Sequence, residues 1–274
     1  MRYNFSIPMP QSAAVTPFPK SKRVLFQNNP LREVVCQLRF PPVLEIASEE
    51  PAKFQNLIRK KYPLYERDEG LALSEELGDL AARLPLAARP ALTHKFLVAD
   101  GSRYVSVARN FVAVSETKYS KWEDFLGQVQ LAKTAAEKIY LPAFYTRIGL
   151  RYVDLIDRQE LGLENVAWAD LVNPSLAGIL AVEPPRRFVE GITSNVVLAL
   201  SLPQCNAVVR MKYGLALVED RKVFAIDSDF YTEDRRETHD VTPILNEFNR
   251  IAGDLFRWAI TTKLHSALKP KPVK

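Results

Sequence analysis

Apolar residues recur along this chain with two different spacings, and these spacings predict where strands and helices lie. From Arg32 to Phe40 apolar and polar residues alternate, which is the two-residue period of a half-buried strand. The same period, bounded by turn signals such as Asp100-Gly101, predicts seven further strands. These strands are expected over residues 94–98, 104–108, 111–115, 144–156, 188–200, 207–213 and 223–230.

Apolar residues three and four positions apart predict the helices. One begins with Ser48 as its N-cap and stops at Pro63, and a longer one opens at Ser120, where Ser-x-x-Glu predicts a capping box. The closing helix is expected to have Thr242 as its N-cap and Pro243 at its first position, and to run to about His265. A shorter helix is predicted over residues 164–172.

The order of these elements predicts an α+β fold. It divides the chain into two similar β-α-β(3)-α halves, residues 29–142 and 143–265, each an antiparallel sheet covered by a long amphipathic helix. The repeat lies in the element order and not in the amino acids. Residues 71–92 are leucine-rich but weakly periodic, and predict either a strand with a loop or a short helix.

Two segments flank the halves. Residues 1–28 form a proline-rich arm, which is either disordered or extended across the body or a neighbouring subunit, because Phe5, Phe18 and Phe26 are costly to leave in water. Self-association is therefore one expectation. Residues 266–274 form a basic tail.

Charge and cysteine content narrow the function classes. The chain has 37 basic and 32 acidic residues, and much of the excess lies in the tail and around Lys20, Lys22 and Arg23. A dedicated nucleic-acid binder would be more basic, so any contact with nucleic acid would depend on the two ends. The two cysteines stand in apolar stretches, and neither a secretory signal nor a membrane-spanning run occurs, which predicts a soluble cytoplasmic protein with no membrane contact.

The common catalytic signatures do not occur in the sequence. It contains no glycine-rich phosphate loop, no nucleophile elbow and no metal-ligand spacing around its histidines, His94, His239 and His265. Cys36 and Cys205 are expected to be buried and unreactive. We therefore expect no cofactor.

Four arginines are candidates for an anion-binding patch. Arg147 and Arg151 lie four apart on one strand and so share a face, where folding could add Arg39 or Arg210. The competing interpretation is cross-strand ion pairing with Glu33, Asp154 or Asp227.

Asp227 and Asp229 form a candidate metal site. They alternate on a predicted strand, so both carboxylates face the same side, a geometry that could hold Mg²⁺. A strand that ends in a solvated acidic loop would show the same pattern.

Three stretches together resemble a bacterial family of about this length that is scattered across unrelated genomes and has no established function. The first stretch holds Asn29-Pro30-Leu31 with Glu33, Leu38-Arg39-Phe40, and Phe54, Ile58 and Tyr62-Pro63 of the first helix. The central stretch is Arg147-Ile148-Gly149-Leu150-Arg151-Tyr152, and the third is Leu255-Phe256 through Ile260-Thr261 on the last helix. The sequence departs from the family pattern at Val153-Asp154, where an Asn-Arg pair is expected. The resemblance implies a shared fold and an accessory role in a bacterial defence or toxin-antitoxin type system, and it implies no catalytic residue.

These observations favour a non-enzymatic binding or interaction protein that contacts a protein partner or a second copy of itself. The alternative is a Mg²⁺-dependent enzyme acting on a phosphorylated or nucleotide-like substrate through the arginines and the Asp227/Asp229 pair.

Overall fold

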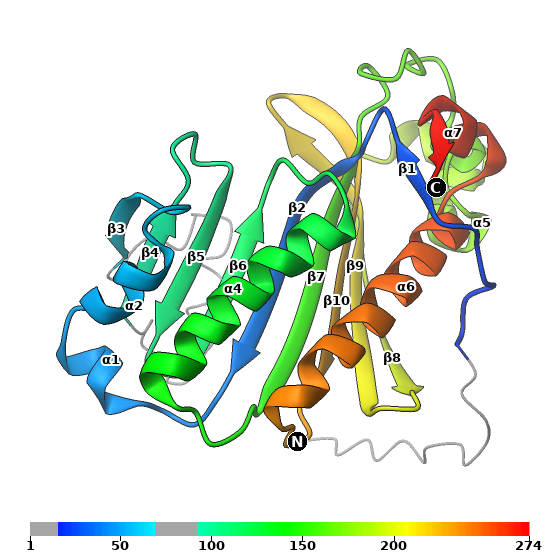
Figure 1. Cartoon of the computed structure of the whole chain (residues 1–274). Helices are drawn as coiled ribbons and strands as arrows, with labels where there is room; N and C mark the ends of the chain where they lie inside the picture. The colour runs from blue at the N-terminus through cyan, green and yellow to red at the C-terminus, as the bar shows by residue number, and fades with distance from the viewer. Residues whose placement is uncertain (1–15, 69–91, 274) are drawn as a thin grey trace, which may run out of the picture. The chain divides into compact units, whose positions relative to one another are not determined.

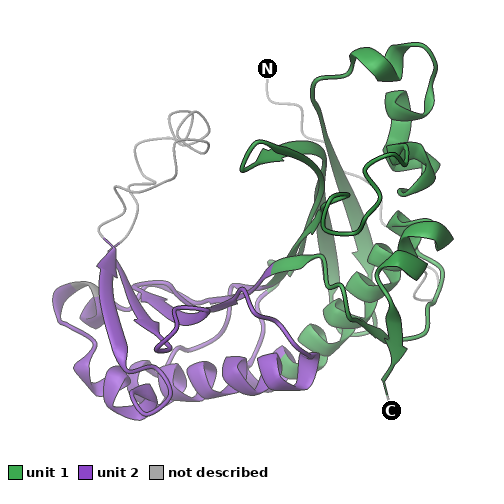
Figure 2. Cartoon of the chain, turned by 90° about the horizontal axis from the view of Figure 1, so that it is seen from above, with its two compact units in different colours: residues 1–32, 150–234, 242–274 green, residues 33–149, 235–241 purple. Residues whose placement is uncertain are grey.

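The computed structural model describes residues 16–68 and 92–273 (Figure 1). The described chain is α+β, and it divides into two compact units (Figure 2). Unit 1 takes the described residues of Met1–Arg32, Leu150–Asp234 and Thr242–Lys274, and unit 2 takes those of Glu33–Gly149 and Arg235–Val241. Each unit is therefore built from stretches that are discontinuous in the sequence, unlike the uninterrupted halves expected above. The internal duplication is not confirmed.

The sheet of unit 2 has the strand order β3-β4-β5-β6-β2 among the described residues. Its apolar residues alternate: Val34, Cys36 and Leu38 of β2 are buried while Arg39 is exposed. The predicted strands from residues 32–40, 94–98, 104–108 and 111–115 are confirmed to within a residue or two. The strands are β2 (Leu31–Arg39), β3 (Leu64–Asp68), β4 (Thr93–Leu97), β5 (Arg103–Ala108) and β6 (Phe111–Glu116).

Helix α4 (Trp122–Tyr140) covers this sheet and packs on α2 (Ala52–Ile58), which follows the short α1 (Leu44–Ser48). Two predicted caps are wrong. Ser48 ends α1 instead of capping a helix that reaches Pro63, because Pro51 separates the two short helices. The Ser120 hydroxyl donates to the Asp124 carboxylate, and Lys121 occupies the N-cap of α4 with no side-chain cap.

The sheet of unit 1 has the order β7-β10-β9-β8 in the described part of the chain. Its strands are β7 (Arg147–Ile156), β8 (Ile192–Ser201), β9 (Asn206–Val218) and β10 (Arg221–Thr232). β9 and β10 extend beyond their predicted ends because Glu219 and Asp220, both at positive φ (48° and 62°), close them in a two-residue turn. The predicted strand at residue 188 begins later, since residues Pro185–Phe188 form a 3-10 turn, η4.

Helix α6 (Val241–Ala259) covers the sheet of unit 1 (Figure 1). The Phe248 ring lies 6.3 Å from that of Phe230, and the Tyr152 hydroxyl donates to Asn249 at 2.9 Å. The predicted N-cap at Thr242 is wrong, because the preceding 3-10 turn η5 (Thr238–Asp240) carries the capping box, formed by Glu237 and Asp240. The predicted single closing helix is also interrupted after Ala259, and a separate α7 (Thr262–Ala267) follows.

The connection from β7 to β8 is less helical than predicted. A 3-10 turn, η2 (Trp168–Asp170), replaces the helix expected over residues 164–172. The short α5 (Pro174–Ala177) and the 3-10 turn η3 (Gly178–Ala181) follow it.

The two ends of the described chain meet in unit 1. β1 (Val24–Phe26), from the predicted arm, pairs antiparallel with β11 (Pro270–Pro272), from the predicted tail. Phe18 is buried against Trp258, and the Phe26 ring lies 5.7 Å from that of Phe256. The same chain therefore covers two of the three phenylalanines that suggested self-association. Phe5 lies outside the described residues, as does nearly all of the segment 71–92.

Candidate functional site

Arg39 and Arg147, two of the four candidate arginines, meet on one acceptor in unit 2. Arg39 Nε donates to Gln37 Oε1 at 2.8 Å, and Arg147 Nη1 reaches the same oxygen at 3.4 Å. Gly149 makes room for this, because a Cβ added there would collide with the Arg147 guanidinium. The close approach at Gly149 thus comes from an arginine two residues earlier on its own strand.

Arg151, the third candidate, pairs with Asp227 in unit 1. Its Nε and Nη2 each donate to one carboxylate oxygen at 2.7 Å. This two-pronged geometry is the strongest that arginine forms with a carboxylate. The competing interpretation from the sequence, an ion pair with Asp227, is present in the structure.

Arg210, the fourth candidate, lies on β9 in register with Asp229 on β10. Its guanidinium donates to the Tyr231 hydroxyl at 3.2 Å and lies 5.6 Å from the centre of that ring. Lys212 is opposite Asp227 in the same register. Asp227 and Asp229 do share one face of β10, as the alternation predicted, and two cations of β9 stand opposite them.

Possible metal ligands are sparse in the part of the chain that the structure describes. Residues 16–68 and 92–273 contain no group of three or more His, Cys, Asp or Glu side chains that could hold a metal ion. His94 is buried and its Nδ1 lies 3.0 Å from the Tyr65 hydroxyl, while burial lowers its pKa. His239 is exposed near Asp240, and His265 packs edge-on against Phe26.

Both cysteines are buried and free. Burial raises the pKa of the Cys36 thiol to about 12, and the charge of Arg147 opposes that shift only in part. Since the thiolate is the nucleophilic form, Cys36 is held in its unreactive state at neutral pH.

Asp154 is a buried carboxyl. From the sequence it was expected only as a candidate ion-pair partner of the four arginines. It lies on the face of β7 that carries the buried Leu150, Tyr152 and Ile156. It has no hydrogen bond or ion pair with any other described residue, and burial, with a smaller contribution from the charge of Asp227, raises its pKa to about 7. Its even spacing from Leu150 and Tyr152 was the available signal that it faces the core.

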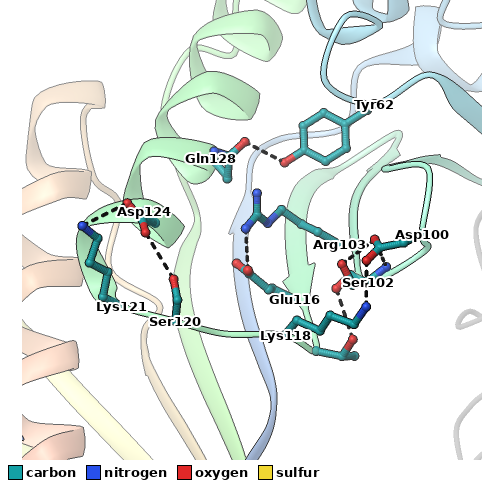
Figure 3. A network of polar contacts seen from close by, with 11 residues as sticks. Tyr62, Asp100, Ser102, Arg103, Glu116, Lys118, Ser120, Lys121, Asp124 and Gln128 are labelled. Carbon is teal, nitrogen blue, oxygen red and sulfur yellow. Dashed lines mark hydrogen bonds and ion pairs between the residues drawn. The ribbon is translucent and has the colours of Figure 1, made fainter. Parts of the chain in front are cut away.

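A network of polar contacts crosses unit 2 beneath α4 (Figure 3). Arg103 on β5 pairs with Glu116 on β6, whose side chain is only 4% exposed. The Tyr62 hydroxyl donates to Gln128 of α4 at 3.1 Å. At its rim, Asp100 accepts from Ser102 and from Lys118. Arg103 Nε is buried without a hydrogen-bond partner among the described residues, but the ionised groups of this network are paired with one another, so we assign it a structural role.

The last strand of unit 1's sheet, β8, presents an edge with an unusual composition. Its ten residues, ITSNVVLALS, include no charged side chain, although 25% of the whole chain is charged and two or three would be expected. β9 lies on one side of it, and no described residue pairs with its other side. Four of its side chains are exposed on the sheet face opposite α6: Thr193, Asn195, Val197 and Ala199.

Comparison with known proteins adds no family to these observations. No protein-family model matches the chain, and no curated protein is significantly similar to it. The resemblance to a scattered bacterial family therefore stays a prediction. Within the described residues no helix combines the length and the apolar character needed to cross a membrane.

Proposed function

We propose that this chain is a non-enzymatic interaction protein that binds an extended protein segment along the edge of β8. One observation carries the proposal: β8 is a ten-residue edge strand without a single charge. Long, uncharged edges offer a template on which another chain adds a strand, and proteins that do not use such an edge usually shorten it or charge it.

The unpaired backbone of β8 would supply the affinity. Every second residue of an edge strand directs its N–H and C=O away from the sheet, so about five residues of β8 hold unpaired donors and acceptors. Each backbone hydrogen bond contributes only about 1 kcal/mol net, and binding therefore needs most of the strand at once. An extended segment of eight to ten residues, roughly the length of β8, fits this requirement.

The side chains around β8 would set the selectivity. Val197 is 58% exposed, and small residues flank it on the same face, which leaves space for a neighbouring strand's larger apolar side chains. Arg210, in register with Val197, and Lys212, in register with Asn195, stand one strand further in and are both exposed. A bound segment that is uncharged or acidic opposite these positions is therefore expected to bind better than a basic one.

The test uses a synthetic strand as its probe. A fluorescein-labelled peptide of alternating threonine and valine, with two aspartates at each end, is titrated with the full chain and followed by fluorescence anisotropy. We expect saturable binding to the wild type, because the peptide provides a complementary backbone edge and no helix propensity.

The matched control is the same peptide with every central amide N-methylated. It keeps all side chains but loses the N–H donors on both of its edges, so binding should disappear. Equal binding of both peptides, or of neither, would contradict the proposal.

The alternative function, a Mg²⁺-dependent enzyme, would require Asp227 to exchange Arg151 for the metal ion, because both of its carboxylate oxygens accept from that arginine. The open edge of β8 needs no such rearrangement, so we place the interaction function first.

A further inference from the structure

We infer that the segment bound by β8 is the β8 strand of a second copy of this chain, paired antiparallel about a two-fold axis near Val197. This inference rests on the proposed function and names its partner. The argument comes from what a two-fold axis requires of a strand.

A two-fold axis that pairs a strand with its own copy must stand perpendicular to the sheet. The rotation then leaves corresponding faces of the two sheets on the same side of the combined sheet. The residue at the axis lies opposite the same residue of the partner. Any charge at the axis would face an identical charge, which destabilises a strand pair. The uncharged composition of β8 meets this condition at every position of the strand.

The neighbouring pairs are equally compatible. With the axis at Val197, Asn195 lies opposite the partner's Ala199, and Thr193 opposite the partner's Ser201. On the face that carries α6, Val196 lies opposite the partner's Leu198. In the single chain both of these side chains are only half-buried. Pairing would therefore cover apolar surface that β9 and α6 leave partly in water.

The strand pair is long enough to hold two copies together. Nine residues of each β8 overlap when the axis is at Val197, which yields about eight to ten backbone hydrogen bonds across the interface. Interfaces of standard size contain about ten direct hydrogen bonds. The contact is thus of the right order for a reversible dimer.

The cations near β8 do not oppose this arrangement. Arg210, opposite Val197 on β9, would face the partner's Arg210 across two intervening strands. Three inter-strand spacings separate them by about 14 Å, which exceeds the Debye length of about 8 Å at physiological salt. Their repulsion is therefore largely screened.

Light scattering after size exclusion, over low micromolar to several hundred micromolar protein, tests the inference. Wild-type chain should move toward a mass twice its 31.0 kDa as concentration rises. Val197→Lys should remain at the single-chain mass, because two lysines meet at the axis, and Val197→Glu should do the same. Circular dichroism checks that each variant is folded. We expect both to fold, because the Val197 side chain is already exposed in the single chain.

Mixing the two variants provides the decisive step. Lysine and glutamate then lie opposite one another at the axis, so the mixture should regain the dimeric mass that each variant lost. The matched control is Leu217→Lys, the same kind of change at an exposed residue of β9, which should leave the wild-type mass unchanged.

Three outcomes would overturn the inference: a wild type that stays monomeric throughout, a dimer that survives Val197→Lys, or a mixture that fails to recover. The proposed function is judged separately by the labelled peptide. A monomeric wild type that binds the peptide removes the second copy as partner and leaves a foreign strand, whereas a monomer that binds no peptide removes both.

Discussion

The sheets of the two units end in strands that treat their exposed edges differently. β3, at the end of unit 2's sheet, has five residues, of which Glu66, Arg67 and Asp68 are charged, and Asp68 pairs with Lys95 of the neighbouring strand at 2.7 Å. β8, at the end of unit 1's sheet, is twice as long and uncharged. Short length and charge are the usual protections against edge pairing. The edge strand of unit 2 is both short and charged, whereas that of unit 1 is neither. β8 is therefore suited to binding another strand and β3 is not.

The interiors of the units show a related difference. The buried carboxylate of unit 2, Glu116, has Arg103 as a partner, whereas Asp154 of unit 1 has no partner within the described residues. Unit 1 also pairs its other buried carboxylates, Asp157 with Arg221 and Asp254 with Arg250. Asp154 differs from all of these because a raised pKa, and not a cation, neutralises it. Four measurements, in order of decreasing effect, test how far this contrast holds.

The largest effect is expected from Glu116→Gln in unit 2. The change leaves the Arg103 guanidinium, 24% exposed, without its ion-pair partner and should lower the free energy of unfolding by about 3 kcal/mol. Urea denaturation measures it. The control is Asp100→Asn, which breaks the exposed pair with Lys118 and should destabilise the fold clearly less than Glu116→Gln does. Equal losses in the two variants would show that the Arg103–Glu116 pair is not a buried one.

Asp154 should make unit 1 sensitive to pH in the opposite sense to most carboxylates. Its folded pKa, about 7, lies above its ordinary value of 3.8, so the folded state binds the proton more tightly. The stability this provides is complete below pH 4 and is lost as the pH rises toward 7. Asp154→Asn should flatten that slope and exceed the wild type at pH 8 by about 1–2 kcal/mol, because a neutral amide costs less to bury than a carboxylate.

Urea titrations at pH 5, 6, 7 and 8 give the comparison for Asp154→Asn. An unchanged difference between variant and wild type across this range would mean that the carboxyl is not buried in the folded protein. Asp157→Asn is not a suitable control because its carboxylate is itself buried and pairs with Arg221. Glu190→Gln serves instead, because that carboxylate pairs with Lys222 in solvent.

A smaller effect is expected where a tyrosine hydroxyl donates to a side chain of the long helix of each unit. Tyr152→Phe removes the bond to Asn249 in unit 1 and should cost about 1 kcal/mol. Tyr62→Phe removes the bond to Gln128 in unit 2 and should cost somewhat more, since Tyr62 is fully buried and Arg103 also interacts with its hydroxyl. The two phenylalanine variants are compared by thermal unfolding; a larger loss in unit 1 would reverse the expected order.

The smallest effect concerns the protected edge. Replacing Glu66 and Arg67 by threonine removes two exposed charges from β3 and should change the free energy of unfolding by no more than about 0.5 kcal/mol. The mass by light scattering should not change either, because five residues offer too few backbone hydrogen bonds to hold a partner. New association by this variant would show that charge, and not length, keeps β3 apart from other chains.

Local patterns in the sequence were sufficient for the strands around residues 32–40, 94–98, 104–108 and 111–115 and for the two long helices. They failed at helix ends. Ser48, Ser120 and Thr242 all had the composition of N-caps, yet Pro51, Lys121 and the turn ending at Asp240 mark the true starts. A cap depends on where the helix meets the sheet, which no stretch of four residues encodes.

The amino-acid sequence by itself determined which residues alternate on strands and that the cysteines are buried, since both follow from the spacing and apolar character of the neighbouring residues. Only the tertiary structure decided that Arg151 meets Asp227, that Asp154 is buried without a partner among the described residues, and that β8 lies at an edge. Strand order joins residues far apart in the chain, and the same uncharged run would be ordinary in the middle of a sheet. At the edge, its unpaired backbone becomes a place where another strand can bind.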